Sequence, residues 1–117
     1  MLRISKDQFD RFQIQNLDCF ISRVVAFLQS QFDEYSSVSA IKIKAATEPL
    51  VVRSIAYGLE TEQEIVVFVL AAHHLGNNFD VEIAEVNKSL SDPQKNSVWK
   101  MAWLEALIFQ AEGRRRE

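Results

Sequence analysis

The segment from Thr61 to Gly76 constrains the fold most strongly, because it carries helix signals at both of its ends. Thr61 and Glu64 stand at the spacing of a capping box, in which each side chain bonds the backbone N–H of the other residue. Gly76 is the residue type that commonly ends a helix. Eight consecutive apolar residues, 65–72, lie between these signals. A helix that is apolar on every side is usually surrounded by other elements, so this segment predicts the central helix of a bundle.

Two helical regions are predicted before this central helix. In the first, which Ser5 caps, apolar residues recur at helical spacing over residues 9–32. The second is predicted to be interrupted by Pro49, because proline lacks the N–H that a helix interior needs. Thr47 would cap the piece that follows the proline, and Gly58 would end it.

Two further helices are predicted after Gly76. Asp80 would cap a short helix over about residues 81–90. Asp92 as cap and Pro93 at the first helical position would open a last helix that ends at Gly113. The pattern therefore predicts an all-α fold, a bundle of about five helices with a range of four to six.

Length and composition favour one domain over residues 1–117, since a chain of this size can bury a single core. The only cysteine, Cys19, cannot form an internal disulfide. No apolar run reaches the ~18 residues of a membrane span, and the first residues do not resemble a signal peptide. We therefore expect a cytoplasmic protein without a membrane span. Residues 59–92 hold seven acidic and one basic side chain, which disfavours binding to nucleic acid.

No motif of catalytic or ligand-binding residues indicates an enzyme, a metal site or another cofactor site. His73 and His74 are adjacent, and adjacent helical residues point ~100° apart, so they are poorly placed to chelate one ion. The nearby carboxylates, such as Glu82 and Glu85, have the spacing of a solvated helical face. We interpret one histidine as partly buried and the other as edging an interface.

Aromatic residues give the stronger signal, and it points to protein binding. Trp99 and Trp103 lie four residues apart on the last predicted helix, and tryptophan is enriched at interface hot spots. The spacing is also typical of core residues. Phe79 either fills the core or offers a contact from its loop. We expect partner contacts at Phe79, Trp99, Trp103 and His74.

The order of these parts resembles small helical accessory proteins encoded beside type VI secretion effectors, spike-tip proteins and their adaptor chaperones in Gram-negative bacteria. The likeness is strongest in "YGLETEQEIVVFVLAAHHLGNNFD" over residues 57–80. The residues that carry it are Tyr57, Gly58, Leu59, Thr61, Glu62, Phe79 and Asp80. The resemblance implies a non-enzymatic, co-chaperone-like protein that binds an effector, or its adaptor chaperone, before loading on the secretion spike.

Two other classes stay open from the sequence. An immunity protein would use the acidic stretch 59–92 to cover a toxin's active site. A ligand- or metal-responsive regulator would use His73 and His74. A homodimer would also satisfy surplus apolar helical surface.

Overall fold

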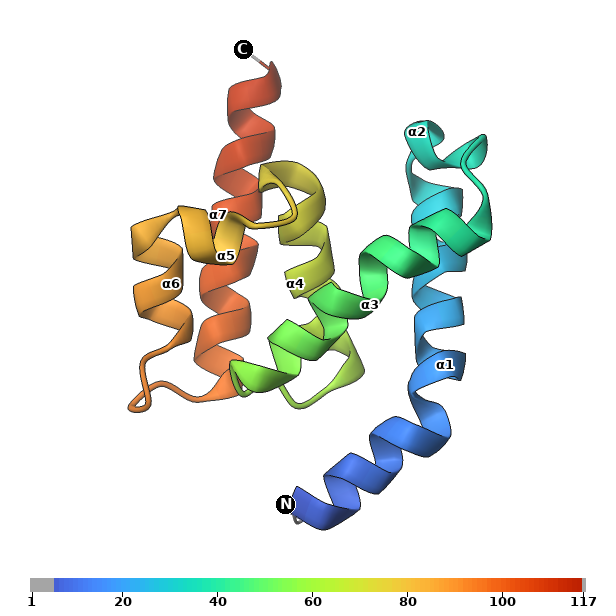
Figure 1. Ribbon diagram of the computed structural model, residues 1–117. Coiled ribbons are helices and arrows are strands. Elements are labelled where there is room, and N and C mark those ends of the chain that lie inside the picture. The colour runs from blue at the N-terminus through green and yellow to red at the C-terminus, as the bar shows by residue number, and fades with distance from the viewer. Residues whose placement is uncertain (1–5, 117) are drawn as a thin grey trace. The chain divides into compact units, whose positions relative to one another are not determined.

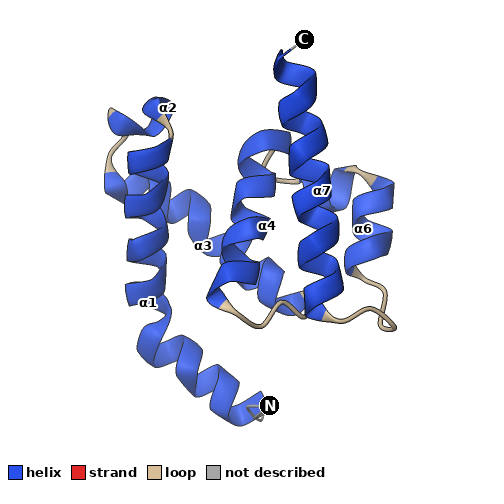
Figure 2. Ribbon diagram, turned by 180° about the vertical axis from the view of Figure 1, so that it is seen from behind, coloured by secondary structure: helices blue, strands red, loops and turns tan. Residues whose placement is uncertain are grey.

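The computed structural model describes the backbone of residues 6–116 and the side chains of residues 18–112. This part of the chain folds into helices and contains no strand, which confirms the all-α prediction (Figure 2). It contains seven helices, two of which have only four residues, so the helix count is higher than expected. None of the described helices is long and apolar enough to cross a bilayer.

Figure 1 shows the helices in chain order. They are α1 (Lys6–Gln31), α2 (Asp33–Ser36), α3 (Ala40–Ala56), α4 (Glu62–Leu75), α5 (Phe79–Glu82), α6 (Ala84–Leu90) and α7 (Ser97–Arg116). Their contacts divide the chain into two compact units, Met1–Thr47 and Glu48–Glu117. Each unit is described by itself, and organisation as a single domain stays a prediction.

In the first unit, α1 buries a stripe of apolar residues at the helical spacing that the sequence predicted. The buried members are Phe20, Ile21, Val24, Val25 and Leu28. Gln29 donates a hydrogen bond to the carbonyl of Val38 at 3.3 Å and ties α1 to the chain beyond α2. The predicted cap at Ser5 lies outside the described residues.

Helix α3 is continuous through Pro49, so the predicted interruption there is wrong. Thr47 does not act as a cap, since its hydroxyl donates to the carbonyl of Ile43 within the same helix at 2.7 Å. Proline removes one backbone donor, but the flanking turns keep their own hydrogen bonds and Leu50 and Val51 are buried. The boundary between the two units falls between Thr47 and Glu48.

The end of α3 is a Schellman motif, as Gly58 predicted. Gly58 has a φ of 95°, which favours glycine, and its N–H bonds the carbonyl of Ile55 at 2.9 Å. The N–H of Leu59 bonds the carbonyl of Ser54 at 3.1 Å. Helix α3 therefore stops sharply before the turn that leads into α4.

Helix α4 is the central helix of the second unit, as predicted, and contacts both α5 and α7. Both halves of the capping box are formed between Thr61 and Glu64, and Gly76 ends the helix with a φ of 109°. Residues 65, 67–69, 71 and 72 are buried, and Phe68 is fully enclosed. The apolar surface of α4 is thus covered by neighbouring elements on several sides.

Two of the helix starts predicted for the second unit are wrong. Asp80 lies inside α5 and its carboxylate turns inward, so it caps no helix. Asp92 accepts from the N–H of Gln94 in a turn, and α7 begins later, with Asn96 accepting from the N–H of Trp99 at 2.8 Å. The last helix also continues through Gly113 instead of ending there.

Candidate functional site

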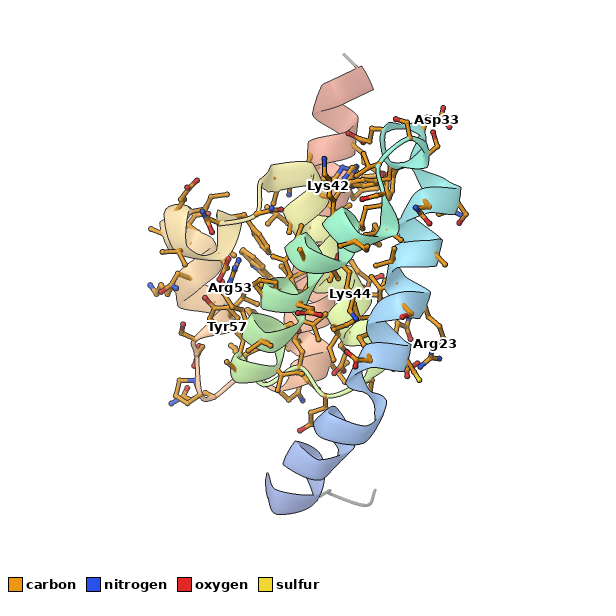
Figure 3. The ribbon with its side chains drawn as sticks, turned by 45° about the vertical axis from the view of Figure 1, so that its right-hand side comes forward. Arg23, Asp33, Lys42, Lys44, Arg53 and Tyr57 are labelled. Atoms are coloured by element: carbon orange, nitrogen blue, oxygen red, sulfur yellow. The ribbon has the colours of Figure 1, made fainter. Side chains whose placement is uncertain are left out.

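A buried carboxylate links the last turns of α3 to α5. Asp80 is fully buried. Its Oδ2 accepts from Arg53 Nε at 3.0 Å and from Tyr57 Oη at 2.8 Å, and its Oδ1 accepts from Arg53 Nη2 at 2.5 Å. Arg53 Nη2 also donates to the carbonyl of Asn77 in the turn before α5. Arg53 and Tyr57 are four residues apart, so they lie on one side of α3, as Figure 3 shows.

The surroundings of this cluster fix its charge state. Burial by itself would raise the pKa of Asp80, but the hydrogen bonds from Arg53 and Tyr57 and the charge of Arg53 outweigh it, so the pKa lies below 3.8. Burial and the hydrogen bond to Asp80 raise the pKa of Tyr57 above its ordinary value. At neutral pH the cluster therefore holds a carboxylate, a guanidinium and a neutral phenol.

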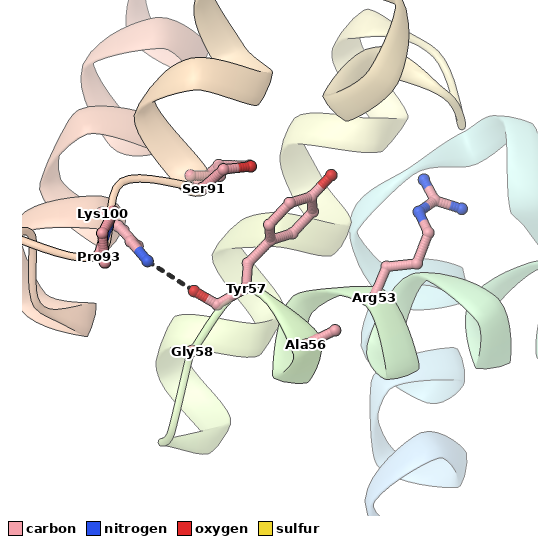
Figure 4. Close-up of a pocket in the computed structure, with 8 residues that line it drawn as sticks. Arg53, Ala56, Tyr57, Gly58, Ser91, Pro93 and Lys100 are labelled. Carbon is pink, nitrogen blue, oxygen red and sulfur yellow. Dashed lines mark hydrogen bonds between the residues drawn. The ribbon is translucent and has the colours of Figure 1, made fainter.

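Lys100 of α7 reaches the end of α3. Its Nζ donates to the carbonyl of Tyr57 at 2.7 Å (Figure 4). That carbonyl belongs to the C-terminal turn of α3, where the helix dipole favours a cation. Only 6% of Lys100 is exposed, and no carboxylate of the described side chains forms an ion pair with it.

An open pocket of about 570 Å³ lies beside this contact. Its lining comes from the end of α3, the end of α6, the following loop and α7: Arg53, Ala56, Tyr57, Gly58, Leu90, Ser91, Pro93 and Lys100. In the view of Figure 4 the Tyr57 ring stands between Arg53 on one side and Ser91, Pro93 and Lys100 on the other. The lining holds two cationic side chains and no acidic one, in a chain whose net charge is −3.

A second buried carboxylate, Glu64, joins α4 to α7. Its Oε1 accepts from the N–H groups of Glu60 and Thr61 at 2.8 and 3.1 Å, and its Oε2 accepts from Ser97 Oγ at 3.0 Å. Only 3% of Glu64 is exposed. The capping box therefore also positions the first turn of α7, a tertiary role that the sequence pattern did not indicate.

The outward side of α7 carries several apolar residues and one acid, Glu105. Exposure reaches 61% for Val98, 37% for Trp99 and 76% for Phe109. Ala102 and Ala106 are exposed between them. We call these five residues the outer face of α7. Lys95 lies over the Trp99 ring, with its Nζ 4.9 Å from the ring centroid.

The four predicted contact residues occupy different environments. Trp99 lies on the outer face, and Trp103 is half-buried. Phe79 is 1% exposed and packs on Phe68 with ring centroids 5.1 Å apart, so its side chain fills the core and is not offered to a partner. The side chain of His74 is 8% exposed, and its Nε2 lies 3.5 Å from Glu112 Oε1 on α7.

The sequence pattern does not indicate a role for Arg53 or Lys100, and it predicts a cap at Asp80 where the structure has a buried carboxylate. The spacing of Arg53 and Tyr57 by four residues was a usable signal, because it places a guanidinium and a phenol on one helical face. Nothing in the sequence pairs Lys100 with Tyr57, which stands 43 positions earlier. No group of three side chains among the described histidines, cysteines and acids could hold a metal ion.

Comparison of this chain with protein-family models, with curated proteins and with solved structures found no match. The geometry of the second unit is therefore the basis for assigning a role to these residues.

Proposed function

We propose that this protein is a non-enzymatic, co-chaperone-like accessory that binds another protein through the outer face of α7. The observation that carries the proposal is the exposure of Val98, Trp99 and Phe109 on one side of a helix whose opposite side packs on α4. Water-facing helical surfaces are ordinarily charged or polar, and contiguous exposed apolar patches commonly mark interaction sites.

The spacing of the outer face suits a helix that lies in a partner's groove. Val98, Ala102 and Phe109 stand at i, i+4 and i+11, which places them along one line of α7, with the exposed Glu105 between them at i+7. Trp99 lies next to this line and is the kind of large, rigid side chain that dominates binding energy at interfaces. The mechanism would be to hold or mask an apolar surface of the partner until it is handed on.

The partner class rests on the resemblance of residues 57–80 to accessory proteins of type VI secretion. We propose a secreted effector, or its adaptor chaperone, before loading on the spike. The Tyr57–Asp80 hydrogen bond gives a physical reason for that sequence pattern, since both residues hold the second unit together. The pattern would then mark the scaffold, and the outer face of α7 would carry the binding.

An immunity protein is the second candidate, because much of the acidic stretch is available at the surface. Its exposed members are Glu60, Glu62, Glu82 and Glu85. Glu64 and Asp80 are buried and already bonded, so they would not contribute. Such a protein would inhibit a toxin directly, whereas an accessory would stabilise its partner without blocking activity.

The experiment is co-purification with the products of the neighbouring genes. The test variant carries Val98→Asp and Phe109→Asp, and the matched control carries Val81→Asp, a residue of α5 with 64% exposure. All three positions are exposed, so circular dichroism should show unchanged helicity. We expect capture by the wild type and the control and at least tenfold weaker capture by the test variant. Equal capture by all forms, or no partner at all, would reject the proposal.

The same co-purified complex separates the two candidates. If the partner is a toxin, its activity is measured with and without this protein. Undiminished activity in the complex supports the accessory role. Direct inhibition, weakened by Glu82→Lys and Glu85→Lys, would support the immunity role in its place.

A further inference from the structure

We propose that the pocket between the end of α3 and the start of α7 binds a carboxylate carried on a small apolar body, with Lys100 as its charged anchor. This goes beyond the outer face of α7, since the pocket is lined by different residues. Its volume of about 570 Å³ lies within the ~300–1,000 Å³ of ordinary small-ligand sites.

The charge on Lys100 is the first argument. A buried ammonium is costly unless it is paired and hydrogen-bonded. The hydrogen bond to the Tyr57 carbonyl uses one of the three donors of the ammonium, and no described carboxylate pairs with the charge. The amine nevertheless lines an open pocket, where a ligand anion would complete its environment.

Gly58 lines the pocket beside the Lys100 amine. A Cβ at Gly58 would lie 3.7 Å from Lys100 Nζ, which is ordinary van der Waals contact. The positive φ of Gly58 favours glycine here, so no side chain from this turn stands against the ammonium. Lys100 is therefore held by the end of α3 and still presents donors to the pocket.

The available donors match a carboxylate better than a phosphate. The backbone N–H of Gly58 bonds the carbonyl of Ile55, and that of Ser91 bonds the carbonyl of Asn87. Pro93 has no N–H, and the charge of Arg53 is paired with Asp80 on the other side of the Tyr57 ring (Figure 4). What remains on the Lys100 side is two N–H donors of its ammonium and the Ser91 hydroxyl, one positive charge for the single charge of a carboxylate.

The rest of the lining defines the body of the ligand. Ala56, Pro93 and the Tyr57 ring present apolar surface next to the polar end, and the fully buried Leu90 lies behind them. An alkyl or aryl group attached to the carboxylate would bury this surface on binding. The ligand class is thus a small organic acid, or the C-terminal carboxylate of a peptide with an apolar last residue.

The test is a titration of the full chain, labelled with nitrogen-15, with phenylacetate, phenylacetamide and inorganic phosphate as probes. We expect phenylacetate to shift the amide signals of Gly58, Ser91 and Lys100 in a saturable way. Phenylacetamide has the same shape without the charge and should bind at least tenfold more weakly. Binding of the amide as tightly as the acid, tighter binding of phosphate, or no saturable shift would overturn the proposal.

Two further arms identify the anchor and the source of the carboxylate. Lys100→Met should weaken phenylacetate binding about ten- to hundredfold, as expected for loss of a charged hydrogen bond, while Lys95→Met on the preceding loop should not. Should Lys100→Met lose its fold, Ser91→Ala at an exposed position replaces it, with an expected loss of about threefold. The tripeptide Gly-Gly-Phe with a free C-terminus, compared with its amide, tells a peptide source from a free acid. Tighter binding of the free tripeptide than of phenylacetate assigns the pocket to a protein C-terminus.

Discussion

Tyr57 donates a hydrogen bond to Asp80 across 23 residues of sequence, with 2.8 Å between Tyr57 Oη and Asp80 Oδ2. The two residues stand at opposite ends of the stretch 57–80, whose middle is the central helix α4. Their hydrogen bond therefore joins the two ends of the segment that contains α4. Arg53 donates two more hydrogen bonds to the same carboxylate. Asp80 thus accepts three hydrogen bonds from other residues, as many as Glu64, the other buried carboxylate of the second unit.

Removing the Tyr57 hydroxyl should lower the stability of the folded protein. Tyr57→Phe takes one donor from a buried carboxylate and leaves the ring in place, so we expect a loss of about 1–3 kcal/mol in the free energy of unfolding, measured with urea. Asn87→Ala is the control, because its amide bonds the same hydroxyl at a long 3.5 Å and is exposed. An equal effect of both variants would contradict the role given to Tyr57.

Neutralising Asp80 should cost more and should also change the response to acid. Asp80→Asn leaves Arg53 without its counter-charge, and we expect a loss of about 3 kcal/mol, at the lower end for a broken buried pair because 30% of the Arg53 side chain is exposed.

The sign of the pH effect follows from the lowered pKa of Asp80. Because the folded pKa lies below the unfolded value of 3.8, the unfolded state takes up the proton first as pH falls. The stabilisation that the ionised Asp80 contributes is present above pH 3.8 and is lost as the pH falls through the pKa of the folded state. Urea unfolding from pH 7 to pH 2.5 should show this decline in the wild type and a flatter curve in Asp80→Asn. Glu85→Gln, which removes one exposed charge, is the control, and a decline unchanged in Asp80→Asn would refute the assignment.

The two residues of the capping box, Thr61 and Glu64, should contribute unequally to stability. Thr61→Ala removes one side-chain cap and should lower the free energy of unfolding by about 1 kcal/mol. Glu64→Ala removes the acceptor for two backbone N–H groups and for Ser97, so we expect about 2–3 kcal/mol, measured by thermal or urea unfolding. Gln63→Ala, at an exposed neighbouring position, should change little. A smaller effect at Glu64 than at Thr61 would speak against its link to α7.

Two phenylalanines should behave in opposite ways. Phe79→Ala should cost about 3–5 kcal/mol in stability, since the ring is buried against Phe68 and truncation leaves a cavity. Phe109→Ala should change stability by less than about 0.5 kcal/mol, because 76% of the residue is exposed. Comparable losses in the two variants would show that the outer face of α7 is covered in the folded protein.

Local signals predicted the helices well wherever a cap or a stop lies next to the apolar pattern. Thr61, Glu64, Gly58 and Gly76 each took the predicted role, because these devices act through hydrogen bonds within one or two turns. The interruption predicted at Pro49 is wrong for a related reason. The hydrogen bond lost at Pro49 is a local cost. The helix nevertheless continues through Pro49, and the next two residues, Leu50 and Val51, are buried.

The sequence predicts helix caps at both Asp80 and Asp92, because aspartate is a common N-cap residue. The structure uses Asp80 for Arg53 and Tyr57 instead, and Asn96 caps α7. A carboxylate can satisfy a nearby backbone N–H or a distant guanidinium, and sequence spacing shows only the first option.

The sequence by itself determined that the chain is helical, where α4 begins and ends, and that α4 is surrounded on several sides. Periodicity and capping are short-range, so they are readable from neighbouring residues. Only the tertiary structure decided that Asp80 turns inward, that Lys100 meets the end of α3, that Phe79 is core and that the outer face of α7 is left exposed. Those outcomes depend on which surfaces meet after the helices pack, and burial is a property of that packing and not of any one segment.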